Sequence, residues 1–324
     1  MILPGNLSRF MTPKLAIIAR GRQNLEGVNS NATPESRSES RGSKLIGVAT
    51  ADEFEQVRSD PNPIRRGQRA TELMTIYQQR ATELARLRKA AIEEAHQEGL
   101  SYTEIAEQLG ITKGRISQIR TSAPRPERAF FGVGPVAVGI PRRFGLEDGR
   151  ERPFFDANDQ ATQLAIESLL ARLSLACNVF AIDPDRAELP SGDCVIICGP
   201  KSAPVARHLL EGDPYLDFER DEDGWWITDA KARQRHNSPY RRDSSIRTDI
   251  GYLSRRREND RVIVHIAGIT SIGSLGVADW LDKHLATLFD PTSNFVSAVI
   301  ECDFDAEFAV TDSRLIVGPY RDSE

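Results

Sequence analysis

From residue 136 to residue 319, short continuous apolar runs alternate with longer amphipathic segments. The runs are rich in β-branched side chains, which is typical of strands buried on both faces. The segments between them predict helices near residues 159–175, 204–210 and 274–288, and this alternation favours a mainly parallel sheet covered by helices. The apolar runs are "VAVGIP", "CNVFAI", "DCVIICG", "WWIT", "RVIVHIAG", "FVSAVIEC" and "RLIVGP". We therefore predict a Rossmann-like α/β domain over residues 136–320.

A different periodicity, with apolar residues three and four apart, runs from Arg69 to Glu98. Neither Pro nor Gly occurs there before Gly99, so one long amphipathic helix is predicted. Arg80 interrupts its apolar stripe, and we therefore favour packing against helices of the same domain, with a coiled-coil dimer as the alternative. The stripe consists of Leu73, Tyr77, Leu84, Leu87 and Ala91.

The next stretch, "LSYTEIAEQLGITKGRISQIR", carries the signals of two short helices joined by a tight turn. Ser101 and the acid three residues later form a capping box, which starts a helix over residues 102–109. Gly110 can adopt the positive φ of the turn. Thr112 can cap a second helix over residues 113–120.

The apolar side chains of this stretch are predicted to fall on one inward face, and Ala106 is small enough for the two helices to cross closely. These are the packing requirements of a small all-helical helix-turn-helix domain. The predicted inward side chains are Ile105, Leu109, Ile111, Ile116 and Ile119.

Polar side chains occupy the remaining positions of the second helix, and no acid occurs on it. Arg115, Ser117 and Gln118 are candidates for base contacts, and Lys113 and Arg120 for phosphates. A helical hairpin that packs against protein with a basic face is the alternative interpretation. The predicted DNA-binding residues are Thr112, Lys113, Arg115, Ser117, Gln118 and Arg120.

"SYTEIAEQLGITKGRISQIR" resembles the helix-turn-helix of region four of bacterial sigma factors and of sigma-like regulators. The layout is similar to that of actinobacterial sigma factor-like helix-turn-helix DNA-binding proteins. No region-two segment is recognisable upstream, and a large α/β domain follows instead. The resemblance therefore implies a regulator that binds double-stranded DNA, with RNA polymerase as a further partner, rather than a working sigma factor.

The distribution of charge agrees with this assignment. Residues 1–60 carry a net charge of +1, residues 61–128 carry +4, and residues 129–324 carry -10. The segment with the helix-turn-helix signals is the basic one, as attraction to phosphates requires.

Residues 1–60 mix Ser, Asn, Arg, Glu and Gly without apolar periodicity, which predicts a mostly disordered N-terminal tail. Met11 is an alternative start. The prolines and glycines of "TSAPRPERAFFGVGP" predict a linker at residues 123–135 between the helical domain of residues 61–122 and the α/β domain.

The chain contains no run of 18 apolar residues and no signal-peptide pattern, so we expect a cytoplasmic protein that does not bind membranes. Its four cysteines are dispersed, and two lie within "DCVIICG", where free cysteines usually act as small buried hydrophobes. No histidine pair has metal-ligand spacing. No disulfide, metal or cofactor is therefore predicted.

Two strand ends of the α/β domain carry glycine and hydroxyl residues directly before a helix, in "ICGPKSAPVARHLL" and "IAGITSIGSLGVADWL". Free amides at a helix N-terminus suit phosphate or carboxylate. Ser274 and Leu275 stand where a P-loop needs Lys and Ser/Thr, so ATP hydrolysis by that mechanism is not expected. Ordinary tight connections are the alternative. The predicted ligand-binding residues are Gly199, Lys201, Ser202, Gly268, Ser271, Gly273, Ser274 and Gly276.

A basic stretch at residues 231–261 has a net charge of +6 within the acidic domain. It is predicted to steer an anionic ligand, to touch DNA, to meet an acidic patch of a second protomer, or to form a solvated loop. Just before it, "DEDGWWITD" predicts a hairpin whose Trp225 and Trp226 point to opposite faces, with one of them in the core.

We therefore expect a homodimeric, sequence-specific transcriptional regulator whose α/β domain senses a small anionic, nucleotide-like ligand. Asp249, Glu301 and Asp303 are acids available for catalysis, but no nucleophile–base set is legible, and we predict that the chain is not an enzyme. The alternatives are a nucleotide- or NAD-processing enzyme with an appended helix-turn-helix, and a DNA-binding protein whose α/β domain is a protein-interaction platform.

Overall fold

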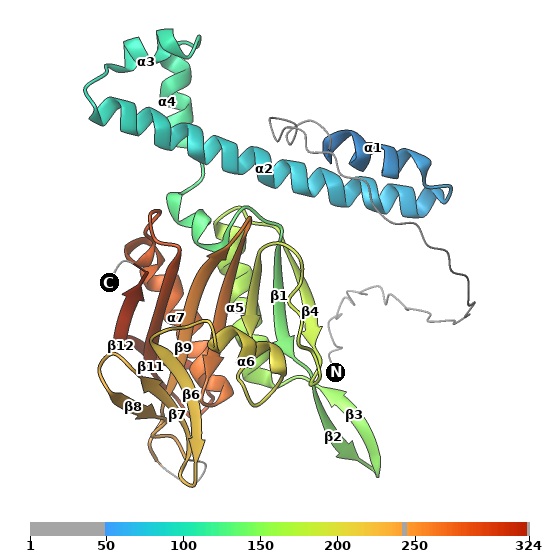
Figure 1. Ribbon diagram of the computed structural model, residues 1–324, viewed down its shortest axis with the longest axis vertical. Coiled ribbons are helices and arrows are strands. Elements are labelled where there is room, and N and C mark those ends of the chain that lie inside the picture. Colours follow the sequence, from blue (N-terminus) through green and yellow to red (C-terminus); the bar gives the residue numbers. More distant parts are fainter. Residues whose placement is uncertain (1–48, 242–244, 323–324) are drawn as a thin grey trace, which may run out of the picture. The chain divides into compact units, whose positions relative to one another are not determined.

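The computed structural model describes residues 49–241 and 245–322, which form a helical N-terminal region followed by a mixed α/β domain (Figure 1). The predictions for residues 1–48, including a start at Met11, lie outside the described residues. Residues 49–59 form a helix, α1 (Ala49–Ser59), that the sequence analysis did not predict.

Helix α2 (Pro63–Gln97) is 35 residues long and begins six residues before the predicted start. Asn62 caps it, because its side-chain oxygen accepts hydrogen bonds from the amides of Ile64 at 3.0 Å and Arg65 at 3.1 Å. Pro63 occupies the first helical position, where its missing amide hydrogen costs nothing. The helices α3 (Tyr102–Gln108), α4 (Lys113–Ser122) and the 3₁₀ helix η1 (Pro126–Phe131) follow.

The α/β domain is built on a seven-stranded sheet with the order β12-β11-β9-β10-β5-β1-β4. The strands β4 (Cys177–Ile182), β1 (Val136–Pro141), β5 (Cys194–Ile197) and β10 (Arg261–Gly268) are parallel neighbours. The strands β9 (Thr248–Glu258), β11 (Phe295–Phe304) and β12 (Val310–Arg321) pair in the antiparallel sense. The expectation of a mainly parallel sheet is therefore correct for one half only, and the sheet is mixed.

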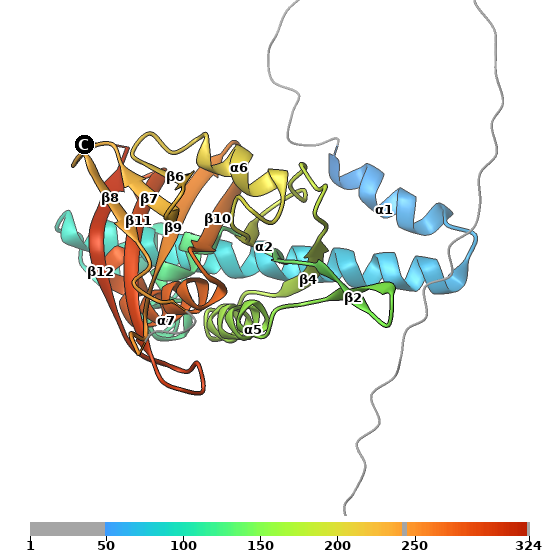
Figure 2. The same cartoon turned by 90° about the horizontal axis from the view of Figure 1, so that it is seen from below.

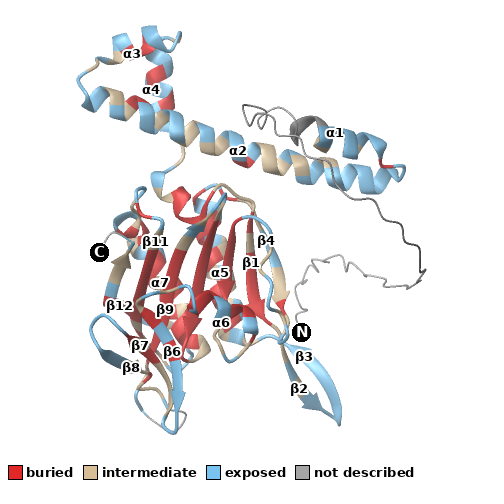
Figure 3. Cartoon of the chain, viewed as in Figure 1, coloured by how far each residue is buried: buried red, intermediate tan, exposed pale blue. Residues whose placement is uncertain are grey.

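Different elements cover the two faces of this sheet (Figure 2). Helices α5 (Ala157–Arg172) and α7 (Ser271–Leu288) enclose the largest hydrophobic core against one face. Helix α6 (Pro204–Leu210) packs with the strands on the other face. A small antiparallel sheet of β6 (Leu216–Asp221), β7 (Gly224–Asp229) and β8 (Gln234–Asn237) encloses a third core there. Figure 3 shows the buried residues concentrated in the central strands.

A separate hairpin of β2 (Arg143–Glu147) and β3 (Arg150–Phe154) follows β1 directly. No residue of this hairpin is buried, and Leu146 is 83% exposed. This hairpin was not expected from the sequence.

The basic stretch at residues 231–261 is not a solvated loop, because it contains β8 and the central strand β9. Arg255, on β9, is only 3% exposed, and burial lowers its pKa to about 10. Its guanidinium donates to the carbonyl oxygens of Ser293 at 2.8 Å and Phe130 at 3.4 Å. A charged residue is tolerated inside a sheet when its donors are satisfied in this way.

The predicted tryptophan hairpin is present as β6 and β7. Trp225 packs against the core that includes the buried Ile227. Trp226 lies under the guanidinium of Arg235, 4.5 Å from the ring centre, and its indole donates to Asp221 at 2.8 Å. The two rings therefore serve opposite faces of the small sheet, as the alternation predicted.

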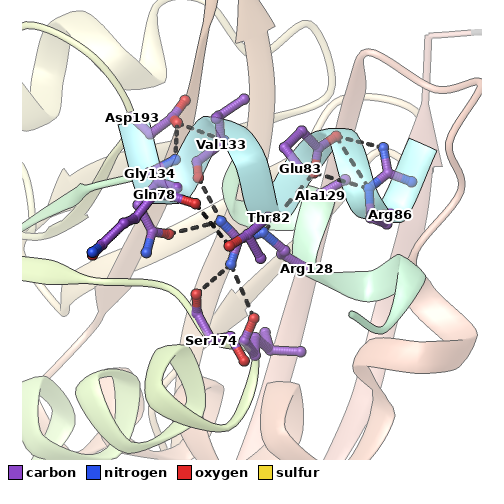
Figure 4. A network of polar contacts seen from close by, with 12 residues as sticks. Gln78, Thr82, Glu83, Arg86, Arg128, Ala129, Val133, Gly134, Ser174 and Asp193 are labelled. Atoms are coloured by element: carbon purple, nitrogen blue, oxygen red, sulfur yellow. Dashed lines mark hydrogen bonds and ion pairs between the residues drawn. The ribbon is translucent and has the colours of Figure 1, made fainter. Parts of the chain in front are cut away.

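The linker is attached to both α2 and the α/β domain by Arg128 of η1, whose side chain is fully buried (Figure 4). Its guanidinium donates to the side chain of Gln79 on α2 and to the carbonyl of Val133, both at 2.7 Å. It also donates to the carbonyls of Leu173, at 3.1 Å, and Ser174 after α5. One side chain thus satisfies polar groups of three segments.

Gly276 allows α7 to approach β11 closely, because a Cβ there would lie 2.3 Å from the sulfur of Cys302. We predict that Gly276→Ala lowers the free energy of unfolding by about 1–3 kcal/mol through overpacking. Gly67→Ala is the matched control, since a Cβ at this position of α2 meets nothing within 4 Å. Gly67→Ala should raise the free energy of unfolding by about 0.5 kcal/mol, because alanine has a higher helix propensity than glycine. Urea denaturation measures both, and equal effects would contradict the packing argument.

Candidate nucleic-acid interface

The ends of α3 and α4 are fixed by the residues that the sequence singled out. The amide of Ser101 donates to the Glu104 carboxylate at 2.8 Å, and the amide of Glu104 donates to the Ser101 hydroxyl at 3.3 Å. These bonds hold the pKa of Glu104 below its usual value. Gly110 has a φ of +65°, and the hydroxyl of Thr112 accepts from the amide of Arg115 at 3.2 Å. The capping box, the turn glycine and the second cap are therefore confirmed.

The core of this unit differs from the predicted one at two positions. Leu109 is 50% exposed, so its assignment to the inward face is wrong. Ile92 of α2 is buried instead, because α2 packs against both short helices and fills the space between them. Ile111 is only partly buried at the edge of this core. The buried members are Ile92, Ile105, Ala106, Ile116 and Ile119.

The outer face of α4 presents the predicted polar side chains, all of them exposed. The guanidinium of Arg115 donates to the side-chain oxygen of Gln118 at 3.1 Å, so two candidate base-contacting groups lie together. The hydroxyl of Thr112 is already used as the helix cap. The predicted members exposed on α4 itself are Lys113, Arg115, Ser117, Gln118 and Arg120.

Arg120 lies at a fixed place on this face. Its guanidinium stacks over the ring of Tyr102, 4.4 Å from the ring centre, and Tyr102 in turn stacks on His96 of α2. A cation held by an aromatic ring keeps its outer N–H groups available for a phosphate. No acid within residues 49–241 and 245–322 pairs with Arg120, so its positive charge is positioned without being neutralised there.

Two short helices on a common core, with a glycine turn and a polar outer face on the second helix, define the helix-turn-helix class of DNA-binding units. Residues 83–125 match the family model of Sigma-70, region 4. This segment is therefore similar to a DNA-binding unit of sigma factors, which is compatible with a transcriptional regulator. No curated protein and no solved structure matches the chain.

Within residues 49–241 and 245–322, no helix is long and apolar enough to cross a membrane. The same residues contain no cluster of His, Cys, Asp or Glu arranged to hold a metal ion. All four cysteines are free thiols, and three of them are buried.

The predicted ligand-binding residues divide into two groups. Four of them are used for packing or for local hydrogen bonds. The hydroxyl of Ser274, only 4% exposed, accepts from the amide of Gly268 at 2.8 Å. A Cβ on Gly273 would lie 2.2 Å from the carbonyl oxygen of Ile250, and Gly276 abuts Cys302.

The other four predicted residues lie beyond the carboxyl ends of β5 and β10, and all four are at least partly accessible. The ammonium of Lys201 donates to the carbonyl oxygen of Ile269 at 2.7 Å, which joins the two predicted turns. The structure thus brings both turns to one rim of the sheet. These residues are Gly199, Lys201, Ser202 and Ser271.

The rim also contains polar residues that the sequence analysis did not assign to it. Arg143 donates to the carboxylate of Asp159 at 2.7 Å. Asn158 donates to the hydroxyl of Ser271 at 3.3 Å, which places the N-termini of α5 and α7 side by side. Asp249 accepts from the amide of Gly273 at 2.8 Å. Arg143 and Asn158 lie in the connection after the parallel strand β1, a position that could have indicated them, whereas Asp249 belongs to the antiparallel strand β9 and carries no such signal.

Burial perturbs the ionisable groups of this rim. Desolvation raises the pKa of Asp159 to about 6 against the opposing effect of Arg143, and it also raises the pKa of Asp249. Desolvation, together with the positive charge of Arg143, lowers the pKa of Lys201. The acids Glu301 and Asp303 instead pair with Arg314 of β12.

The raised pKa of Asp159 predicts a pH-dependent stability. The folded state holds a proton that the unfolded state, with a pKa of 3.8, releases between about pH 4 and pH 6. The free energy of unfolding of the wild type should therefore fall by about 1–3 kcal/mol relative to Asp159→Asn as pH rises through that window. Urea denaturation at both ends of the window measures it. Asp185→Asn, at an exposed position, is the control and should follow the wild type. A constant difference between wild type and Asp159→Asn would contradict the assignment.

Proposed function

We propose that this protein is a sequence-specific transcriptional regulator that reads DNA with α4. The observation that carries the proposal is the exposed polar face of α4, held on a buried core within the segment that matches Sigma-70, region 4. A basic helix without acids meets no repulsion from a duplex, and its side chains can reach base edges in the major groove.

In this proposal, Arg115 and Gln118 contact bases while Lys113 and Arg120 contact phosphates. The Arg115–Gln118 hydrogen bond supports the first pair, because it aligns two donor groups one turn apart. The stacking of Arg120 on Tyr102 supports the second, because a positioned cation suits a fixed phosphate.

The DNA-binding proposal predicts different effects for the two kinds of contact. Arg115→Ala with Gln118→Ala should relax base preference by about 1–3 kcal/mol at the contacted positions. Lys113→Ala should weaken binding to all sequences and reduce the salt slope by about 1. Fluorescence anisotropy on selected and random duplexes measures both.

Lys283→Ala, an exposed lysine change on α7, is the matched control and should leave DNA affinity unchanged. If DNA affinity and preference are the same in the α4 variants and the control, the motif does not read DNA.

We also propose that the α/β domain senses a small anionic, nucleotide-like ligand at the rim that contains Arg143, Asn158, Lys201 and Ser271. The parallel half of the sheet, with its four strands, is the part that would correspond to a Rossmann-like domain. In such sheets, ligands bind beyond the carboxyl ends of the parallel strands. Two cations and two adjacent helix N-termini support an anion there. Ligand binding can regulate DNA binding only if the ligand has a higher affinity for one conformation of the protein than for another.

Lys201→Ala should weaken binding of such a ligand by about tenfold, since it removes a charged donor. Thermal shifts of the full chain with NAD and nucleoside phosphates measure binding, and Lys283→Ala again serves as control. If none of these compounds shifts the wild type, the sensing proposal fails while the DNA-binding proposal stands.

A nucleotide- or NAD-processing enzyme is the second candidate, because two carboxyl groups with raised pKa, Asp159 and Asp249, lie at this rim. Turnover of a nucleotide by the wild type, lost in Lys201→Ala, would favour the enzyme over the sensor. A protein-interaction platform would show neither binding nor turnover.

We further propose that the regulator acts in the cytoplasm as a homodimer, with RNA polymerase as an additional partner. The stripe on α2 supports dimerisation, because the side chain of Leu84 is 66% exposed. Light scattering of the purified protein tests the dimer directly.

A further inference from the structure

A cavity of about 340 Å³ lies where α2 faces the turn between β9 and β10, apart from both the helix-turn-helix face and the rim. Glu83, Arg86 and Leu87 of α2 line it together with Arg257 of β9 and Val262 of β10. Ala129, Gly132 and Val133 also line the cavity. Figure 4 shows Ala129 and Val133 within the Arg128 network. A volume of this size is within the range of small-molecule sites.

Two of the three acids of this cavity already accept three hydrogen bonds each. The Glu83 carboxylate accepts three hydrogen bonds from Arg86, between 2.6 and 3.1 Å. The Asp193 carboxylate accepts from the amides of Val133 at 2.7 Å, Gly134 at 2.8 Å and Val262 at 2.8 Å. These acids have little capacity left to bind a cationic ligand.

The arginines of the cavity, in contrast, have N–H groups that make no hydrogen bond within the described residues. The guanidinium of Arg257 has no hydrogen-bond or ion-pair partner among the residues that the structure describes. Arg261 donates to the Pro190 carbonyl and to Glu258 through its two terminal nitrogens, which leaves its Nε–H. The cavity therefore has an excess of charged donors, which favours an anion.

The other lining residues indicate which kind of anion the cavity would bind. Leu87, Ala129, Val133 and Val262 contribute apolar surface, which suits a ligand with an apolar body. Asp260 at the turn is exposed, and its carboxylate has no partner within the described ranges. Its charge disfavours a dianion such as phosphate more than a monoanion.

We propose that this cavity binds a small carboxylate with an apolar body, whose carboxylate pairs with Arg257 and whose body lies against Leu87 and Val262. The site goes beyond the proposed rim site and does not depend on it. Because Leu87 belongs to α2 and the other two residues belong to β9 and β10, the ligand contacts the long helix of the DNA-binding region and the α/β domain at once.

Titration calorimetry of the full chain with benzoate, acetate and inorganic phosphate tests the proposal. Benzoate should bind more tightly than either acetate, which lacks the body, or phosphate, which carries more charge. Arg257→Gln should weaken benzoate binding by about tenfold, because it removes the charged donor. Leu87→Glu should weaken it as well, since it adds a negative charge from α2.

Asp260→Asn is expected to act in the opposite direction and strengthen benzoate binding by about two- to fivefold, because it removes a repelling charge. Arg207→Gln, at an exposed position on α6, is the matched control and should bind as the wild type does. Thermal melts verify that each variant is folded. Absence of benzoate binding by the wild type overturns the proposal, and so does equal affinity in Arg257→Gln and Arg207→Gln. Neither result bears on the rim site, whose test uses Lys201→Ala and nucleotides.

Discussion

The buried guanidinium of Arg128 is the interaction on which the attachment of the helical region to the α/β domain depends. Removing an arginine from water costs several kcal/mol, and desolvation accordingly lowers its pKa. Four hydrogen bonds offset that cost, to Gln79 on α2, to Val133 in the linker and to the two carbonyls that end α5. Because these carbonyls follow the last turn of a helix, they have no intrahelical partners of their own.

Hydrogen bonds to buried charged groups also hold the surrounding segments together. Asp193 precedes β5 and accepts from the linker amides of Val133 and Gly134 and from the amide of Val262 on β10. Arg255 on β9 donates to carbonyls of η1 and to that of Ser293. The linker is thus a structured element bound by side chains from distant strands. This explains why a cavity with defined walls can exist beside it, where a flexible tether would leave only solvent.

Elements whose ends are marked by neighbouring residues in the sequence were predicted accurately, and features that depend on distant residues were not. The strands β1, β4 and β10 and helix α6 were predicted with their observed bounds, because Pro, Gly or polar residues delimit each apolar run. Strand β9 was missed, since its four charged residues between 255 and 258 look like surface. Leu109 was misplaced because Ile92, 17 positions earlier, takes its place in the core. At the rim, Lys201 and Ser271 were predicted, whereas Arg143 and Asn158 were not.

The sequence by itself determined the helix-turn-helix, its caps and its outward polar face, because hydrogen bonds and packing within about 20 residues specify them. It also determined the parallel half of the sheet through its buried apolar runs. The tertiary structure alone decided the antiparallel pairing of β9, β11 and β12, the rim and the cavity beside Arg128. At the rim and in the cavity, the decisive partners are polar groups from strands and turns far apart in the chain. Whether such a group is a buried donor or a solvated charge depends on which distant carbonyls the fold brings to it.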